Sequence, residues 1–220
     1  IFHCAGVGVK QGSSRLTTTD ENINITRSIF DQYQPNASAK IIVITNPVDI
    51  IAYYTWKFSN LPPHQVIGTG TFLDTARLNH YIHETVGADH DVESLMLGEH
   101  GESIVWAKSH SYVDGNNVAD YFTDEQQAKL ELDVIHTASR IKQTQGATIY
   151  AVTLCAIQLM EAMLSPTDRV YSVSCLTDGY YKHLLNCSSQ YIGLPVRIGP
   201  EGVKEIIPLK FTPDELAQLR

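Results

Sequence analysis

Four consecutive residues, 41–44 (IIVI), set the strongest constraint on how this chain can fold. All four are β-branched, and such an uninterrupted run is typical of a strand that is buried on both faces in a parallel sheet. The run stops at residues 45–47 (TNP), and the following residues predict a helix from residue 48 to about residue 58. Proline suits a helix start, because the first turn leaves its N–H groups without intrahelical partners.

Strands and helices alternate on both sides of this run. The apolar patterns predict strands at residues 1–5 and 66–68, and helices at residues 19–33 and 72–86. Thr71 is expected to cap the helix at residues 72–86. Such an alternation favours parallel strands with helices on both faces of the sheet. The predicted fold class is therefore α/β, with half of a doubly wound parallel sheet in this part of the chain.

Beyond residue 91 the pattern becomes mixed, which predicts an α+β part after the parallel sheet. Short strands are expected between residues 92 and 113, around a glycine-containing turn. The other expected elements are helices at residues 124–144 and 148–163, strands at 171–177, 191–198 and 202–208, and a helix start at 212–215. We expect two domains, residues 1–68 and residues 69–220.

Composition narrows the class of protein. The chain has 220 residues, 43% hydrophobic and 18% charged, which is enough to bury a substantial core. The formal net charge of -8 argues against a nucleic-acid partner. No apolar run approaches the roughly 18 residues of a membrane span. The four cysteines show no Cys-x-x-Cys spacing, which predicts reduced, buried thiols in a cytoplasmic protein.

The strongest candidate for chemistry is His100, in the turn at residues 97–102 (LGEHGE). Histidine moves protons near neutral pH, and the flanking glycines allow a sharp turn or a close approach to a ligand. Asp74 can accept a hydrogen bond from His100, which would orient the ring and favour the imidazolium form. The alternative is a lone surface histidine in a turn.

Three further polar residues can act with this histidine. Arg77 lies three residues after Asp74 on the predicted helix, so both share a face, and its guanidinium can hold a substrate carboxylate. Asn46 follows a parallel strand, at the sheet edge where open α/β folds bind ligands. Arg15 follows a glycine-containing loop and can close over a bound anion. The alternatives are a surface ion pair, a helix N-cap and a solvated loop charge, respectively.

Two other patterns are weaker. His80, His83 and Glu84 have helical spacing, but no third ligand converges on the two histidines, so we predict no metal site. Residues 68–71 (GTGT) lack the GxGxxG spacing and are interpreted as a tight crossover between lobes.

Taken together, several segments resemble the NAD-dependent L-2-hydroxyacid dehydrogenases, the family of the lactate and malate enzymes. They come in the order of that family and at close to its spacing, over essentially the whole chain. The segments are residues 5–6 (AG), 14–16 (SRL), 45–49 (TNPVD), 68–77 (GTGTFLDTAR), 98–102 (GEHGE) and, less distinctively, 146–148 (GAT).

The resemblance implies a role for each candidate. His100 would donate and accept the proton, oriented by Asp74. Arg77 would bind the substrate carboxylate, and Arg15 would polarise the substrate carbonyl. Asn46 would hydrogen-bond the substrate oxygen near the nicotinamide. The remaining residues implied at the site are Ala5, Gly6, Ser28, Thr45 and Thr69 along the cofactor, Thr148 in the pocket wall, and Val9 against the variable end of the substrate.

The resemblance also implies the reaction. We expect hydride transfer between NAD and a small L-2-hydroxy acid, with lactate and pyruvate or a close apolar analogue as the pair. Lactate enzymes carry glutamine and malate enzymes arginine at the position of Val9, so we expect rejection of oxaloacetate and a mild preference for apolar 2-oxo acids over pyruvate. A homo-oligomer, dimer or tetramer, is the expected assembly. The alternatives are a malate-type enzyme, a non-catalytic fragment or subunit of such an enzyme, and a zinc hydrolase.

One departure from the family concerns the N-terminus. The chain begins at Ile1, inside a predicted strand and without a methionine. We expect that roughly 80 residues, the first βαβ unit of the Rossmann sheet with its glycine fingerprint and ribose-binding acid, are missing before it.

Overall fold

A computed structural model describes residues 1–8, 18–165 and 167–220 of the chain. Its centre is a six-stranded sheet with the strand order β1-β2-β3-β9-β10-β11. The strands are β1 (Phe2–His3), β2 (Ile41–Val43), β3 (Val66–Gly68), β9 (Val170–Leu176), β10 (Tyr191–Gly199) and β11 (Gly202–Ile206). The first three are parallel, and the last three pair antiparallel.

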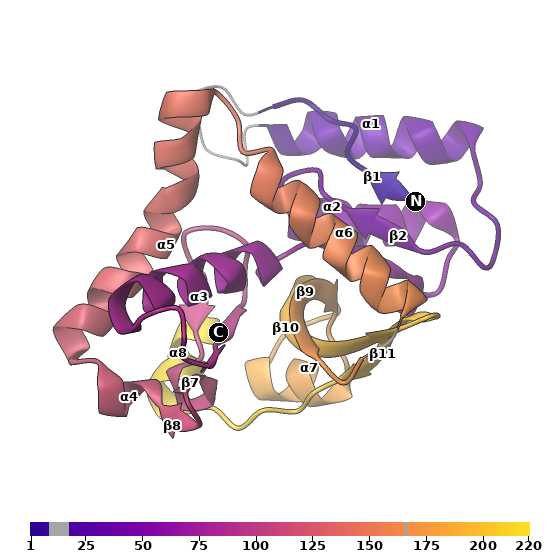
Figure 1. The fold of residues 1–220 in the computed structure, drawn as a ribbon. Coiled ribbons are helices and arrows are strands. Elements are labelled where there is room, and N and C mark those ends of the chain that lie inside the picture. The colour runs from indigo at the N-terminus through magenta and orange to yellow at the C-terminus, as the bar shows by residue number, and fades with distance from the viewer. Residues whose placement is uncertain (9–17, 166) are drawn as a thin grey trace.

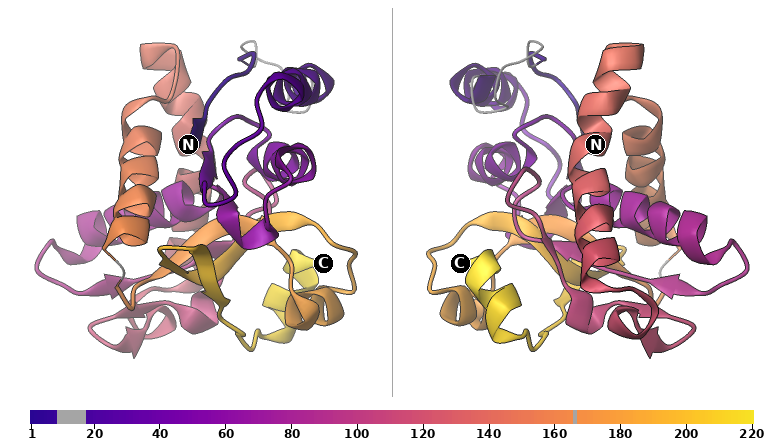
Figure 2. Two further views of the ribbon diagram at one scale, coloured as in Figure 1. Left: turned by 90° about the vertical axis from the view of Figure 1, so that its right-hand side faces the viewer. Right: turned by 90° about the vertical axis from the view of Figure 1, so that its left-hand side faces the viewer.

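Helices cover both faces of this sheet (Figures 1 and 2). On one face lie α1 (Thr19–Gln32) and α2 (Val48–Ser59), and on the other lie α3 (Phe72–Val86) and α6 (Tyr150–Leu164). The long helix α5 (Asp124–Gln145) packs along α3. The α/β class predicted from the alternating patterns is confirmed.

Strand β2 shows why the sheet is buried on both faces. Ile41 and Val43 pack against the α1–α2 side, whereas Ile42 packs against the α6 side. All three side chains are almost fully buried. Burying one such side chain stabilises the folded state by about 1.5–3 kcal/mol, so this short run ties both helical layers to the sheet.

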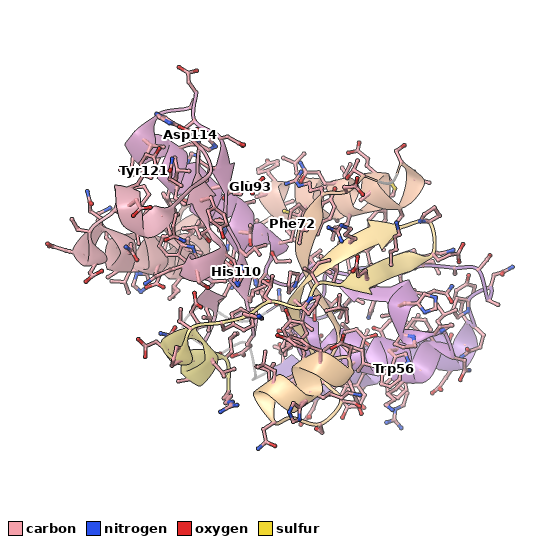
Figure 3. All side chains as sticks on the ribbon, turned by 90° about the horizontal axis from the view of Figure 1, so that it is seen from below. Trp56, Phe72, Glu93, His110, Asp114 and Tyr121 are labelled. Atoms are coloured by element: carbon pink, nitrogen blue, oxygen red, sulfur yellow. The ribbon has the colours of Figure 1, made fainter. Side chains whose placement is uncertain are left out.

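The segment between α3 and α5 packs with these two helices around a separate apolar core. Leu78, Ile82, Trp106 and Val134 are buried in that core. In Figure 3, Asp114 and Tyr121 of this segment lie on the opposite side of the molecule from Trp56 of α2, and Phe72 lies between them. The elements between α3 and α5 are β4 (Val92–Glu93), β5 (Met96–Leu97), β6 (Val105–Trp106), η3 (Lys108–His110), β7 (Tyr112–Val113), β8 (Asn116–Asn117) and α4 (Val118–Tyr121).

Three features differ from the prediction. The parallel and antiparallel strands belong to one sheet, joined by a single antiparallel bridge between Gly68 and Ser174. Helix α7 (Gly179–Leu185), capped by Asp178, was not predicted. Thr71 stands at the N-cap of α3, but its hydroxyl donates to the Ser172 carbonyl (3.4 Å) instead of capping the helix.

The helix near the C-terminus follows the prediction closely. Helix α8 (Pro213–Leu219) begins with a capping box formed by Thr212 and Glu215. The short 3-10 helix η2 (Pro63–Gln65) leads into β3. Within the described ranges, no helix combines the length and apolar character that crossing a bilayer would require.

Candidate active site

The turn that carries His100 is fixed to the central sheet. Gly98 and Gly193 of β10 exchange two backbone hydrogen bonds, at 2.9 and 2.8 Å. Gly98 has a φ of 88°, which favours glycine. A Cβ atom on Gly193 would lie 2.3 Å from the Thr71 hydroxyl, so a glycine is needed for β10 to approach α3 this closely. The turn therefore has a defined position between β10 and the start of α3.

His100, Asp74 and Arg77 form one buried chain of interactions. His100 Nδ1 donates to Asp74 Oδ2 at 2.6 Å, since a carboxylate can only accept, and Arg77 Nη1 donates to Asp74 Oδ1 at 3.0 Å. The three side chains are 10%, 8% and 9% exposed. The alternative of a solvent-exposed Asp74–Arg77 pair is thus wrong, and the second ring nitrogen of His100, Nε2, points away from Asp74.

A cavity of about 360 Å³ lies beside His100 and Arg77, which both line it. Its size suits a small organic ligand. It opens between the loops after β1 and β2, the start of α3, and the segment that joins α5 to α6. Seven residues predicted for the site line it: Gly6, Thr45, Asn46, Thr69, Arg77, His100 and Thr148.

The charge of the cavity wall favours an anion. Arg77 and Lys142 line it, whereas no aspartate or glutamate lies among its described lining residues. The chain as a whole carries a net charge of -8. The cavity is therefore a locally cationic site in an acidic protein, which is suited to a carboxylate ligand.

Asn46 lines the cavity and carries a buried amide oxygen. Its Oδ1 atom is buried and has no hydrogen-bond partner among the described residues. Its backbone carbonyl accepts from Asn22 Nδ2 at 2.7 Å, and Asn22 Oδ1 in turn accepts from the backbone N–H of Val7 at 2.7 Å. Asn46 does not cap α2, because Pro47 occupies the N-cap position. These bonds hold the loops after β1 and β2 together.

Gly6 lets the same two loops come into close contact. A Cβ atom at this position would lie 2.6 Å from Thr45 Cγ2 and 2.9 Å from Asn22 Oδ1. The Thr45 hydroxyl donates to the Ala5 carbonyl at 2.9 Å. A glycine loop and small hydroxyl side chains fit the nicotinamide end of a dinucleotide, where backbone must come near the ligand.

Other predicted site residues lie elsewhere. Ser28 is on the exposed side of α1, where its hydroxyl donates to the Ile25 carbonyl (2.8 Å), and it does not line the cavity. The resemblance alone suggested Ser28, and helix α1 turns it toward solvent. Ala5 is exposed and not itself a lining residue. Arg15 and Val9 lie outside the described residues.

The histidines on α3 do not gather into a metal site. His80 Nε2 lies 3.5 Å from Glu84 Oε1, with both side chains largely exposed, and His83 Nδ1 contacts the Gly87 carbonyl. In the described ranges, no three potential metal-ligating side chains converge.

Sequence reasoning missed three residues at the site. Asp49 accepts a hydrogen bond from the backbone N–H of His100 (2.9 Å), and Lys142 and Cys4 line the cavity. The prediction that all cysteines are buried is wrong for Cys4, which is exposed, and for Cys187, which is half-buried. Lys142 lies on α5, the same helix as the buried Val134. A lysine on a helix is usually a solvent-exposed residue, so the sequence pattern gave no sign that Lys142 lines a cavity. Asp49 belongs to residues 45–49, one of the segments that resemble the dehydrogenase family, and this was the one sequence feature that pointed to it.

Two family profiles match the chain. Residues 1–68 match "lactate/malate dehydrogenase, NAD binding domain", and residues 71–220 match "lactate/malate dehydrogenase, alpha/beta C-terminal domain".

Curated relatives match over nearly the whole chain. An L-lactate dehydrogenase of Halalkalibacterium halodurans is 36% identical over 217 residues, which cover 98% of this chain and 69% of the relative. An L-lactate dehydrogenase of Bacillus pumilus is 35% identical over 223 residues, which cover 98% of this chain and 70% of the relative.

Solved structures share the fold. The minor L-lactate dehydrogenase of Enterococcus mundtii superposes with a TM-score of 0.88 at 32% identity, covering 99% of this chain and 71% of that one. The malate dehydrogenase of Picrophilus torridus superposes with a TM-score of 0.90 at 28% identity, covering 99% and 69%. With the buried His100–Asp74–Arg77 arrangement beside a cationic cavity, these matches show that the chain belongs to the lactate/malate dehydrogenase family.

Proposed function

We propose that this chain catalyses the reversible, NAD-dependent interconversion of a small L-2-hydroxy acid and its 2-oxo acid, with L-lactate and pyruvate as the pair. The observation that carries the proposal is the buried pairing of His100 with Asp74 and of Asp74 with Arg77 at one wall of the cavity. The relatives named L-lactate dehydrogenase support lactate over malate as the substrate.

Arg77 holds the substrate carboxylate in this proposal. Arg77 lines the cavity, and its Nη1 atom donates a hydrogen bond to Asp74, which fixes the position of the guanidinium. A planar guanidinium can make two parallel hydrogen bonds to a carboxylate, which sets the orientation as well as the position of a small acid. Thr148 also lines the cavity and limits the space for the rest of the substrate.

His100 transfers the proton. During reduction, the proton on Nε2 passes to the oxygen of the 2-oxo group, and the developing negative charge on that oxygen is neutralised. Asp74 stabilises the imidazolium before the transfer and keeps the remaining proton on Nδ1 afterwards. In the direction of oxidation, neutral Nε2 accepts the hydroxyl proton.

NADH, when bound, supplies the hydride that reduces the 2-oxo carbon. Gly6, Thr45 and Thr69 would hold its nicotinamide end, since they line the cavity beside Asn46. The Asn46 amide can donate to a carbonyl oxygen and accept from a hydroxyl, so it can contact the substrate in both oxidation states. We expect Arg15 to polarise the carbonyl.

The test is NADH oxidation with pyruvate, followed at fixed enzyme concentration for wild type and His100→Asn. Loss of general acid–base assistance lowers kcat by on the order of 100- to 10,000-fold. The far-ultraviolet circular dichroism spectrum of the variant should match that of wild type. Near-normal turnover by a folded His100→Asn protein would disprove the assignment. Absence of NADH oxidation by wild type would favour a non-catalytic subunit.

We also propose that the protein forms a homo-oligomer through α6. Tyr150, Leu154 and Ile157 lie at successive turns of this helix and are 75%, 60% and 38% exposed. An exposed apolar stripe of this kind marks an interaction surface. Leu154→Lys should lower the mass measured by light scattering, whereas Lys129→Ala on the exposed side of α5 should not change it.

We place the enzyme in the cytoplasm. All four cysteines are free, as expected for a reducing compartment.

A further inference from the structure

His100 is held at two points by two carboxyl groups from different helices. Asp74 of α3 holds its side chain, and Asp49 of α2 holds its backbone. We propose that Asp49 is a positioning residue that fixes the backbone of the His100 turn and so aims the imidazole into the cavity. The proposal rests on the proposed function, in which His100 transfers the proton.

Asp49 lies in a tightly packed part of α2. Asp49 is the second residue of α2, and its neighbours Val48, Ile51 and Ala52 are almost fully buried under the sheet. The Pro47 carbonyl accepts from the Ile51 N–H at 2.9 Å, so the first helical turn is closed. A carboxyl group projecting from such a turn has little freedom, because helix and side chain are both held by packing.

The turn that Asp49 holds is flexible by sequence. Glycines at positions 98 and 101 flank His100 closely, and glycine backbones have wide conformational freedom. The Gly98–Gly193 pairing fixes the entry to the turn. Asp49 Oδ2 accepts from the His100 N–H at 2.9 Å, across 51 residues of sequence, and fixes the turn at the catalytic residue itself.

Burial of Asp49 has a cost. Its Oδ1 atom is buried without a hydrogen-bond partner among the described residues, and so is the hydroxyl of Ser174. Burial raises the pKa of Asp49, an effect that the hydrogen bond from the His100 N–H opposes. An incompletely paired buried carboxyl group destabilises the fold. Groups of this kind concentrate at functional sites.

The position of Asp49 also links two parts of the site. It lies three residues after Asn46, which lines the cavity, and it contacts the residue that transfers the proton. Asp49 thereby ties the turn that carries the imidazole to the segment that carries the Asn46 amide. A shift of about 1 Å in a reacting group can lower the rate of the chemical step by about 100-fold.

The experiment compares Asp49→Ala, Asp49→Asn and a matched control, Asp114→Ala. Asp114 also accepts a backbone N–H from another segment, that of Asp91 at 2.8 Å, but lies far from α2 (Figure 3). Steady-state kinetics with pyruvate and NADH are measured beside hydrogen–deuterium exchange of peptides covering residues 98–103.

We expect Asp49→Ala to lower kcat by about 10- to 100-fold with a much smaller change in the KM for pyruvate, because Arg77 is untouched. The amides of residues 98–103 should exchange faster in this variant. Asp49→Asn keeps an oxygen that can accept the His100 N–H, so it should retain most of the wild-type kcat and the slow exchange. Asp114→Ala should match wild type in both measurements.

Unchanged exchange at residues 98–103 in Asp49→Ala would overturn the proposal, as would a wild-type kcat in that variant. Equal losses in Asp49→Asn and Asp49→Ala would also overturn it, because the accepted hydrogen bond would then not be the cause. If wild type itself does not reduce pyruvate, the proposed function fails, but the exchange measurement still decides whether Asp49 fixes the turn.

Discussion

At the scale of single residues, Arg77 gives the most direct test of substrate orientation. Arg77→Lys keeps the positive charge but loses the planar pair of donors that matches a carboxylate. We expect the KM for pyruvate to rise at least about tenfold, whereas the Kd for NADH, measured by fluorescence titration, stays close to wild type. Equal weakening of both ligands would show that Arg77 supports the fold instead of the substrate.

The four cysteines differ in burial, so their reactivity can report where NADH binds. Burial raises the pKa of Cys155 to about 11 and that of Cys175 still further, so both thiols should be unreactive in the native protein. Cys4 is exposed and lines the cavity, whereas Cys187 is half-buried and lies outside it. In a titration with a disulfide reagent, NADH should slow the reaction of Cys4 and leave that of Cys187 unchanged. Protection of Cys187 alone would place the cofactor elsewhere.

Single residues of the site were predictable when they belonged to one local pattern. Asp74 and Arg77 share a helix face, and His100 stands between glycines, so their types and spacing indicated the site. Asp49 was missed because its hydrogen bond to His100 spans 51 residues. Ser28 was placed in the site by resemblance only, and its helix orients it away from the cavity.

At the scale of elements, Glu215 joins α8 to the segment before β7. Its carboxylate accepts from the Ser109 N–H (2.8 Å), the Ser109 hydroxyl (2.7 Å) and the Thr212 N–H (2.8 Å). Burial acts to raise the pKa of Glu215, but these hydrogen bonds together outweigh it and lower the pKa below the ordinary value of 4.5. Hydrogen bonds to a charged group contribute about 1.5–3 kcal/mol.

The sign of the pH dependence follows. A carboxyl group with a lowered pKa in the folded state stabilises that state above its ordinary pKa, and the stabilisation is lost as the pH falls through the lowered value. We therefore expect acid to reduce the free energy of unfolding of wild type more than that of Glu215→Gln. Chemical denaturation at neutral and acidic pH measures both. Parallel losses in the two proteins would show that Glu215 has no special share in acid stability.

Elements were predictable where periodicity is local. Helix α3 has the predicted bounds, and β2 is buried on both faces as its β-branched run indicates. The joining of β3 to β9 was not visible, because it depends on one bridge between residues more than 100 positions apart, at Gly68 and Ser174. Helix α7 is only seven residues long, so its pattern gives too few repeats to recognise.

At the scale of the whole molecule, a cationic cavity in an acidic protein predicts a salt-dependent reaction. Lys142→Ala removes a basic side chain that lines the cavity. We expect kcat/KM for pyruvate to fall in this variant, by more at low ionic strength than at high, since salt screens the attraction. Lys129→Ala removes the same charge from the same helix at an exposed ion pair with Asp133 and should have little effect. Equal effects of the two substitutions would contradict a local role for Lys142.

The pairing of Gly98 with Gly193 has a consequence for how the enzyme fails on heating. Two backbone hydrogen bonds join the turn that carries His100 to β10, which lies between β9 and β11 in the antiparallel half of the sheet. It therefore cannot melt ahead of the scaffold, as an independent lid would. Thermal inactivation and loss of the sheet signal should follow one curve, so that residual activity becomes a direct gauge of how many molecules still have an intact sheet.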